Sequence, residues 1–240
     1  MSRKKYEIAL KIAASPWYIK RNLLAPKSLT FRYFVYRAMR PLLKLYYKLF
    51  KLTRAVAPWT SQASIRTLDE LLEKEMVGFE YGSGRSTIFF AARVRHLTSV
   101  EHNEHWFRIV QEKLKKRSLG NVDYHYIPQG TKPPEREYRE FRNFGLDLQE
   151  FQVRKDYHEY FSFISTFPDD HFDFIFIDGR ARVECTLSGI STLKKGGLLI
   201  LDNSDRTRYH PLFKILADWP QVTSTTGLFD TTIWFKPEIT

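Results

Sequence analysis

Cysteine is almost absent from this chain of 240 residues, in which Cys185 is the only one. A single thiol excludes an internal disulfide framework and a zinc site built from several cysteines, and it fits a reducing compartment such as the cytoplasm. Long apolar runs are missing too, since no uncharged stretch reaches the ~18–20 residues that a membrane-spanning helix needs. With 43% hydrophobic and 27% charged residues, the composition is still that of a globular protein.

Acidic residues are scarce in the first quarter of the chain. Residues 1–60 hold 14 Lys and Arg against one acid, Glu7, whereas residues 61–240 hold 24 against 26. After Pro41, which we expect to open a helix, apolar residues recur at helical spacing and basic residues fall on the other side. We therefore predict a basic amphipathic helical extension over residues 1–60, attached to a main domain over residues 61–240.

Three roles are open for this extension. It can pack on the main domain or on a second copy of the chain, it can lie on a membrane surface, or it can contact nucleic acid. Packing is the favoured interpretation, peripheral membrane contact comes second, and nucleic acid is the least favoured partner. The expected location is the cytoplasm, with membrane association left open, and the oligomeric state is undetermined.

From residue 60 onward, short apolar runs alternate with amphipathic stretches. Strands are expected over residues 76–79, 96–100, 122–127, 172–177, 198–201, 222–226 and 231–235. Helices are expected over residues 61–72, 88–94, 106–114, 157–167, 182–193 and 209–219. Such units predict an α/β fold with a doubly wound, mostly parallel seven-stranded sheet, closed by a hairpin around Gly227. Ligands of these sheets bind beyond the carboxyl ends of the strands.

A glycine turn follows the first of these strands. Gly82 and Gly84 permit a tight turn and the close approach of a ligand to the backbone. A dinucleotide-binding fingerprint would carry a further glycine or alanine where Thr87 stands, so a nicotinamide-dependent oxidoreductase is disfavoured. Glu80 can orient an ammonium group, and Glu101, about 20 residues after the turn, can accept hydrogen bonds from ribose hydroxyls.

Four segments, in this order, resemble the motifs of class I S-adenosylmethionine-dependent methyltransferases. They are the glycine turn at 79–87, the acid-ended strand at 99–102, the strand at 172–179 and the strand at 193–203. The resemblance covers roughly residues 61–240 and implies a Rossmann-like fold with S-adenosyl-L-methionine as cofactor. The cofactor-binding residues that it implies are Glu80, Gly82, Ser83, Gly84, Ser86, Thr87, Glu101, His102, Gln129 and Asp178.

Three polar residues at strand ends are the predicted catalytic group. Asp178, Asp202 and Asn203 resemble the metal ligands of catechol-type O-methyltransferases. That family carries a lysine base where this chain has Ala181, so magnesium is considered but not favoured, and no metal site is assigned. In the alternative interpretation, Asp178 closes the cofactor pocket while the other two cap the next helix.

The sequence thus predicts methyl transfer from S-adenosylmethionine, to an oxygen of a small, sugar-linked or lipid-linked acceptor. Segments 178–185 and 202–206 are similar to a group of bacterial methyltransferase-like proteins of undefined substrate. Four arginines of this region, at 180, 182, 206 and 208, could form a cationic rim for an anionic acceptor, but surface salt bridges are the favoured interpretation. The long connection at 131–158 is expected to be a lid. The alternative function is a noncatalytic adaptor of the same fold, which binds membrane or nucleic acid through its basic N-terminal region.

Overall fold

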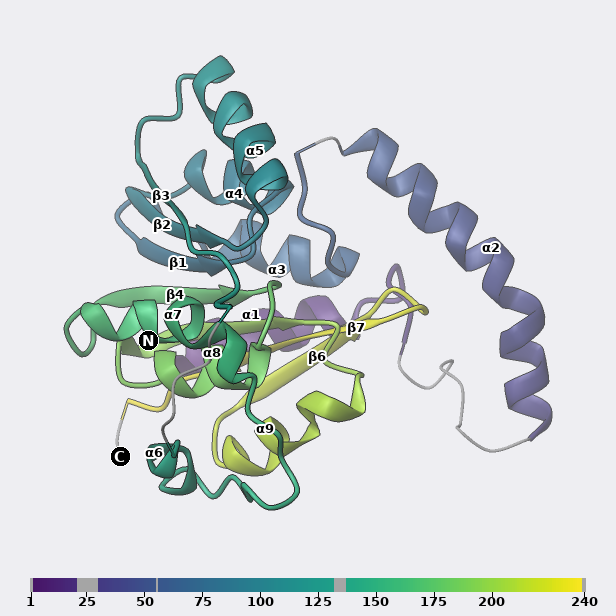
Figure 1. Ribbon diagram of the computed structural model, residues 1–240. Helices are drawn as coiled ribbons and strands as arrows, with labels where there is room; N and C mark the ends of the chain where they lie inside the picture. Colours follow the sequence, from purple (N-terminus) through teal and green to yellow (C-terminus); the bar gives the residue numbers. More distant parts are fainter. Residues whose placement is uncertain (1, 21–29, 55, 132–136, 239–240) are drawn as a thin grey trace.

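The computed structural model describes residues 2–20, 30–54, 56–131 and 137–238, and a single twisted sheet lies at its centre (Figure 1). Its strand order is β3-β2-β1-β4-β5-β7-β6. All pairs from β3 to β5 are parallel, whereas β7 runs antiparallel to both β5 and β6. The strands are β1 Val77–Tyr81, β2 His96–Glu101, β3 Val122–Tyr126, β4 Phe172–Ile177, β5 Leu193–Asp202, β6 Gln221–Thr225 and β7 Asp230–Phe235. The predicted fold class is therefore confirmed, including the closing hairpin.

Helices cover both faces of the sheet. On one face a buried apolar cluster joins the sheet to α1, α3 and α4, and on the other a second cluster joins it to α7, α8 and α9. The helices are α1 Ser2–Ala14, α2 Phe31–Thr53, α3 Gln62–Leu71, α4 Arg85–Ala91, α5 Glu104–Lys116, α6 Arg139–Arg142, α7 His158–Ser162, α8 Arg182–Gly189 and α9 His210–Ile215.

Strand β4 is apolar on both faces because both faces are covered by helices. Phe174 and Phe176 face the cluster with α1, α3 and α4, while Ile175 and Ile177 face the opposite cluster. All four are fully buried, so each face of the strand contributes to a core. This arrangement fixes the carboxyl end of β4 beside that of β1, where the acidic strand ends meet.

The N-terminal residues divide into two helices with different surroundings. α1 packs on α3 and β6, where Ala9 is fully buried and Tyr6 meets Phe235 edge to face at 5.5 Å. α2 stands to one side of the sheet in Figure 1. The division at residue 60 stays a prediction, and α1, which precedes it, is part of the cover of the sheet.

The expected start of a helix at Pro41 is wrong. α2 begins at Phe31, after Thr30 whose hydroxyl accepts a hydrogen bond from the amide of Tyr33, and Pro41 lies inside the helix. Proline removes one helical hydrogen bond there, which would be donated to the carbonyl of Arg37. The residues before Pro41 continue the helical pattern, and this continuity outweighs the local signal from the proline.

The helix expected over residues 182–193 ends early, at Gly189. Leu193 already belongs to β5, where it pairs with Phe172, and residues 194–197 continue the strand instead of closing a helix. The register shifts in this region, and Gly196 adopts a φ of +74° that accommodates the irregularity. The helix expected over 157–167 is also shorter, because 3₁₀ turns form part of this stretch, and the helix expected over 209–219 ends at Ile215.

The lid role expected for the connection at 131–158 stays a prediction, and residues 132–136 lie outside the described residues. Tyr138 and Phe141 are buried and stack on each other, with ring centroids 5.6 Å apart. Both also pack against Phe161 of α7. These two rings extend the hydrophobic core and do not line the pocket described below, to which the connection contributes Arg154.

Candidate active site

A pocket of about 690 Å³ lies at the carboxyl ends of β1, β2 and β4. Its lining includes the glycine turn, the end of β2 and the start of α8, as well as a group of arginines. The lining residues are Gly82, Ser83, Glu101, His102, Asn103, His105, Trp106, Arg154, Asp178, Gly179, Arg180, Ala181, Arg182, Arg206, Arg208 and Tyr209. The volume suits a small-molecule ligand.

The glycine turn is shaped by a close approach of two strand ends. Gly82 has a φ of +87°, and its amide donates to the carbonyl of Val100 at 2.9 Å. A Cβ at Gly82 would lie 2.6 Å from the Cα of Gly179. Both the backbone conformation and the space therefore require glycine at this position. Gly84 is buried and does not line the pocket, and a Cβ there would meet the Trp106 ring at 3.9 Å, an ordinary van der Waals contact.

Glu80 lies beneath the turn and is fully buried. Its Oε2 accepts hydrogen bonds of 2.6 Å from the hydroxyls of Thr87 and Ser99, whereas its Oε1 has no hydrogen-bond partner in the described part of the chain. Burial raises the pKa of this carboxyl to about 7, although the neighbouring hydroxyls oppose the shift. Thr87 and the buried Ser86 are thus supports of Glu80 and do not line the pocket.

Glu101, at the end of β2, is the ionised acid of the pocket. Its Oε2 accepts from the amide and the hydroxyl of Ser83, both at 3.0 Å, and its Oε1 accepts from the amides of His102 and Asn103. Burial raises the pKa of Glu101, but hydrogen bonding to the His102 side chain and to the amides of Asn103 and Ser83 outweighs burial and brings the net pKa below the usual range. The Ser83 hydroxyl has a second neighbour, the hydroxyl of Tyr124 at 2.5 Å. It can therefore leave Glu101 when another donor arrives.

The other residues predicted to bind the cofactor are placed differently. His102 lines the pocket with its Nδ1 2.9 Å from Glu101 Oε1. Gln129 lies outside the lining, where its side-chain amide donates to Asp156 at 2.9 Å. The sequence analysis missed Trp106, whose indole N–H donates to the Ser83 carbonyl at 2.7 Å. An aromatic residue in the first turn of the helix after the β2 acid was the available signal.

The predicted catalytic residues meet around a buried arginine. Arg182, whose side chain is 7% exposed, donates to Asp178 Oδ1 at 2.7 Å and to the main-chain carbonyl of Asp202. Its guanidinium also lies 4.0 Å from Asp202 Oδ2. Asp178 reaches the pocket, whereas Asp202 is buried behind the arginine and Asn203 does not line the pocket. The catalytic role of these three residues stays a prediction.

This arrangement bears directly on the metal that was considered. The Arg182 guanidinium already supplies a positive charge to Asp178 and Asp202. The side-chain nitrogen of Asn203 donates to Asp202 Oδ2 at 2.7 Å. Magnesium prefers oxygen ligands, so this hydrogen bond occupies a carboxylate oxygen that a magnesium ion would need. In residues 2–20, 30–54, 56–131 and 137–238, no group of three His, Cys, Asp or Glu is placed to hold a metal ion. The donor set therefore does not fit magnesium, and we derive no step through a metal.

The arginines of the pocket differ in their partners. Arg154 pairs with Asp156 at 2.9 Å, and Arg208 pairs with the buried Glu184 at 3.3 Å. Arg206 donates to the neutral side chain of Asn203, and Arg180 only approaches the His102 ring, at 3.5 Å. No carboxylate is paired with Arg180 or Arg206 among the ion pairs of the described residues. Part of the expected rim is thus structural, and part of it is open.

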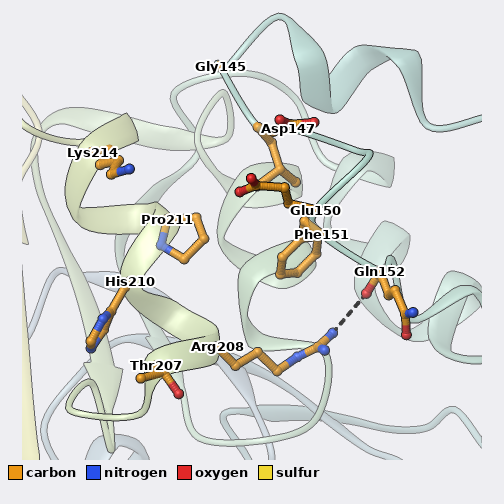
Figure 2. Close-up of a pocket in the computed structure, with 11 residues that line it drawn as sticks. Gly145, Asp147, Glu150, Phe151, Gln152, Thr207, Arg208, His210, Pro211 and Lys214 are labelled. Carbon is orange, nitrogen blue, oxygen red and sulfur yellow. Dashed lines mark hydrogen bonds between the residues drawn. The ribbon is translucent and has the colours of Figure 1, made fainter.

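A second hollow, of about 550 Å³, adjoins the first through Arg208, which lines both. Figure 2 shows it between the segment at 145–152 and the start of α9, with Asp147 and Glu150 facing Lys214 across it. Arg208 donates to the carbonyl of Gln152 at 3.1 Å, as the dashed line in Figure 2 marks. The second hollow holds neither the glycine turn nor the β2 acid.

No protein-family model matches the chain, and no curated protein matches it. Among solved structures, it is similar to a methyltransferase-like protein from Silicibacter pomeroyi, with 22% identity, coverage of 72% of this chain and 84% of that chain, and a TM-score of 0.48. It is also similar to a SAM-dependent methyltransferase from Aquifex aeolicus, with 14% identity, coverage of 71% and 87%, and a TM-score of 0.44. A third similar structure is the YcgJ protein from Bacillus subtilis, at 14% identity and a TM-score of 0.36. That match covers 55% of this chain and only 45% of the other.

Similarity at these identities concerns the fold alone. The strand order, the antiparallel final strand and the glycine turn between β1 and α4 are observed in the chain itself. On these features the chain has the Rossmann-like fold of the class I S-adenosylmethionine-dependent methyltransferases.

Proposed function

We propose that this protein transfers a methyl group from S-adenosylmethionine to an anionic oxygen acceptor. The observation that carries the proposal is that the buried Glu101, whose pKa is lowered, and the glycine turn at Gly82 and Ser83 line the same pocket. A carboxylate at this place suits the two hydroxyls of a ribose, and a glycine turn lets a ligand approach the backbone closely.

The buried acid Glu80 supports a cationic ligand end at the turn. Its Oε1 has no hydrogen-bond partner among the described residues, and burial raises the pKa of its carboxyl to about 7. A positive charge close by would favour the ionised form and lower that pKa. Glu80 is fully buried, so we expect it to act on the ammonium group of the cofactor through an intervening water or through the amides of the turn.

When bound, S-adenosylmethionine supplies a methyl group that its sulfonium has already activated, so that alignment of donor and acceptor matters more than acid or base catalysis. The residues of the chain would then hold the ribose on Glu101, form the tight turn at Gly82 and fix the turn through the hydrogen bond from the Trp106 indole to the Ser83 carbonyl. Asp178, which Arg182 engages, closes the pocket. An acceptor oxygen that is already ionised at neutral pH needs no base, which agrees with the absence of a lysine at Ala181.

The anionic acceptor is inferred from the open arginines. Arg180 and Arg206 line the pocket without a described carboxylate partner, and guanidinium groups bind carboxylates and phosphates through paired hydrogen bonds. The adjoining hollow beyond Arg208 offers room for the remainder of a small, sugar-linked or lipid-linked acceptor.

Calorimetric titration of the full chain with S-adenosylhomocysteine tests the cofactor site. We expect Glu101→Gln to weaken binding by roughly 10- to 100-fold, because it removes one or two charged hydrogen bonds. Glu112→Gln, an exposed change on α5, is the matched control and should leave binding unchanged. Equal affinity in wild type and Glu101→Gln would refute the site.

Transfer of a labelled methyl group to a panel of carboxylates and phosphates tests the reaction. We expect Arg180→Gln and Arg206→Gln to raise the KM for the acceptor while leaving the affinity for S-adenosylhomocysteine unchanged. Cofactor binding without transfer to any acceptor class would instead favour the noncatalytic adaptor.

A further inference from the structure

Helix α2 contacts the rest of the protein along one side only. Of its 23 residues Tyr47 alone is buried, and its ring meets Phe229 edge to face at 5.3 Å. Leu43 packs against Gly227, because a Cβ added to Gly227 would lie only 2.9 Å from the Cδ1 atom of Leu43. Arg85 of α4 donates to the carbonyl of Lys51 at 2.9 Å. These contacts anchor the C-terminal half of the helix and leave its opposite side open.

The open side of α2 is apolar, and we call it the apolar stripe. Its members are Phe31, Phe34, Val35, Met39, Leu42, Leu45, Tyr46, Leu49 and Leu52. They are 45–82% exposed, and they make up nine of the thirteen large hydrophobic side chains that are exposed in the described part of the chain. Leu42, Leu45, Leu49 and Leu52 follow one another at steps of three and four residues, which places them along a single line of the helix. A continuous apolar surface of this kind marks an interaction site.

The charge of α2 has one sign. The helix carries six basic residues, Arg32, Arg37, Arg40, Lys44, Lys48 and Lys51, and no Asp or Glu. Arg37, Lys44 and Lys48 are exposed and follow one another at steps of seven and four, so they form a row beside the apolar stripe. Long basic side chains in such a row can keep their stems on apolar surface while their charged ends reach outward.

The charge decides between the two occupants that an apolar helix face admits. A second copy of α2 would bring six further positive charges and no acid to pair with them, so two copies would repel each other. A bilayer with anionic headgroups offers an apolar layer for the stripe and negative charge for the basic row at the same time. The length of the helix, about 34 Å at 1.5 Å per residue, lets the stripe lie in the plane of such a surface.

We propose that α2 binds the surface of an anionic phospholipid bilayer, with the apolar stripe in the interface and the basic row on the headgroups. The contact is peripheral, and none of the described helices has the length and apolar content needed to cross a bilayer. Since Arg85 directly follows the glycine turn and holds the C-terminal end of α2, this contact keeps the pocket beside the membrane. The pocket would then lie within reach of a lipid-linked acceptor, and this consequence rests on the proposed function. The membrane contact itself does not depend on the proposed function.

Flotation of the full chain with vesicles of phosphatidylcholine, with and without phosphatidylglycerol, tests the proposal. Leu45→Glu/Leu49→Glu places two acids in the stripe at positions that are 54% and 53% exposed, so the fold should be unaffected. We expect it to reduce partitioning onto anionic vesicles by roughly 100-fold, because two leucines lose their apolar contact. Lys44→Gln/Lys48→Gln should reduce it roughly 10- to 30-fold on anionic vesicles and leave the weak binding to neutral vesicles unchanged.

Lys115→Gln/Lys116→Gln on α5 is the control that lowers the net charge away from α2, and it should bind anionic vesicles within about 3-fold of wild type. Equal losses in this control and in the Lys44/Lys48 variant would overturn the assignment to α2. Sedimentation of the wild type as a dimer that the leucine variant dissolves, without vesicle binding, would assign the stripe to a second copy. Binding to duplex RNA but not to vesicles would also overturn the proposal. Titration with S-adenosylhomocysteine is the independent readout, because every α2 variant should bind it like the wild type.

Discussion

Glu80→Gln is the most informative single substitution, because it replaces a buried acid by a neutral group of the same shape. The amide oxygen can accept from Thr87 and Ser99 as Oε2 does, and the amide nitrogen then takes the place of the unpartnered Oε1. The glutamine thus imitates the protonated acid. We expect the two proteins to be similarly stable at low pH and to diverge as the pH rises.

The size of the effect follows from the raised pKa. The carboxyl of Glu80 titrates near 7 in the folded protein and at 4.5 in the unfolded chain, so the folded state binds the proton more tightly. The unfolded state therefore gains stability relative to the folded state as the pH rises from the lower value through the higher one. Between pH 5 and pH 8, the free energy of unfolding of the wild type should fall by about 2.5 kcal/mol relative to Glu80→Gln.

Urea unfolding at pH 5, 6, 7 and 8, followed by circular dichroism, measures this difference. Use of the variant as reference cancels the contributions of the other acids, among them Asp202, whose pKa burial also raises. A difference between the two proteins that stays constant from pH 5 to pH 8 would show that Glu80 is ionised throughout. The account of the buried acid under the turn would then be wrong.

The remaining predictions concern the turn, the buried arginine and the thiol. Gly82→Ala should lower the free energy of unfolding by at least about 2 kcal/mol, because the new Cβ strains the backbone and meets Gly179. Gly120→Ala is the control, because its Cβ would point into open space, and it should change this free energy by less than about 1 kcal/mol. Urea unfolding compares the two variants. By the same measurement, Arg182→Met should lower the free energy of unfolding by about 3–5 kcal/mol, because Asp178 and the buried Asp202 lose their cation. An unchanged free energy of unfolding would contradict the role given to Arg182. Cys185 is fully buried, and burial raises the pKa of its thiol, so an aromatic disulfide reagent should react with it only as fast as the chain unfolds.

The amino-acid sequence by itself determined the sheet and the location of the pocket. A run of apolar residues that ends in an acid can be recognised locally, and such runs predicted β1, β2, β4 and the C-terminal part of β5. In a parallel sheet the ends of these runs must meet at one edge, so Glu101 and Asp178 were expected together before their geometry was known. The turn at Gly82 and Gly84 could also be recognised from neighbouring residues, since these two glycines lie two positions apart directly after the strand.

The tertiary structure alone decided which groups those acids contact. Arg182 pairs with Asp178 within its own segment, but the guanidinium reaches Asp202 only because β4 and β5 lie side by side. Periodicity likewise gave α2 its two sides, but it did not say which side the body of the protein would cover. That choice came from Tyr47 and Phe229, which are far apart in the chain. A pattern along the sequence records what a segment tends to form, whereas the partner of a charge or of an apolar face is set by residues that the folded chain brings from elsewhere.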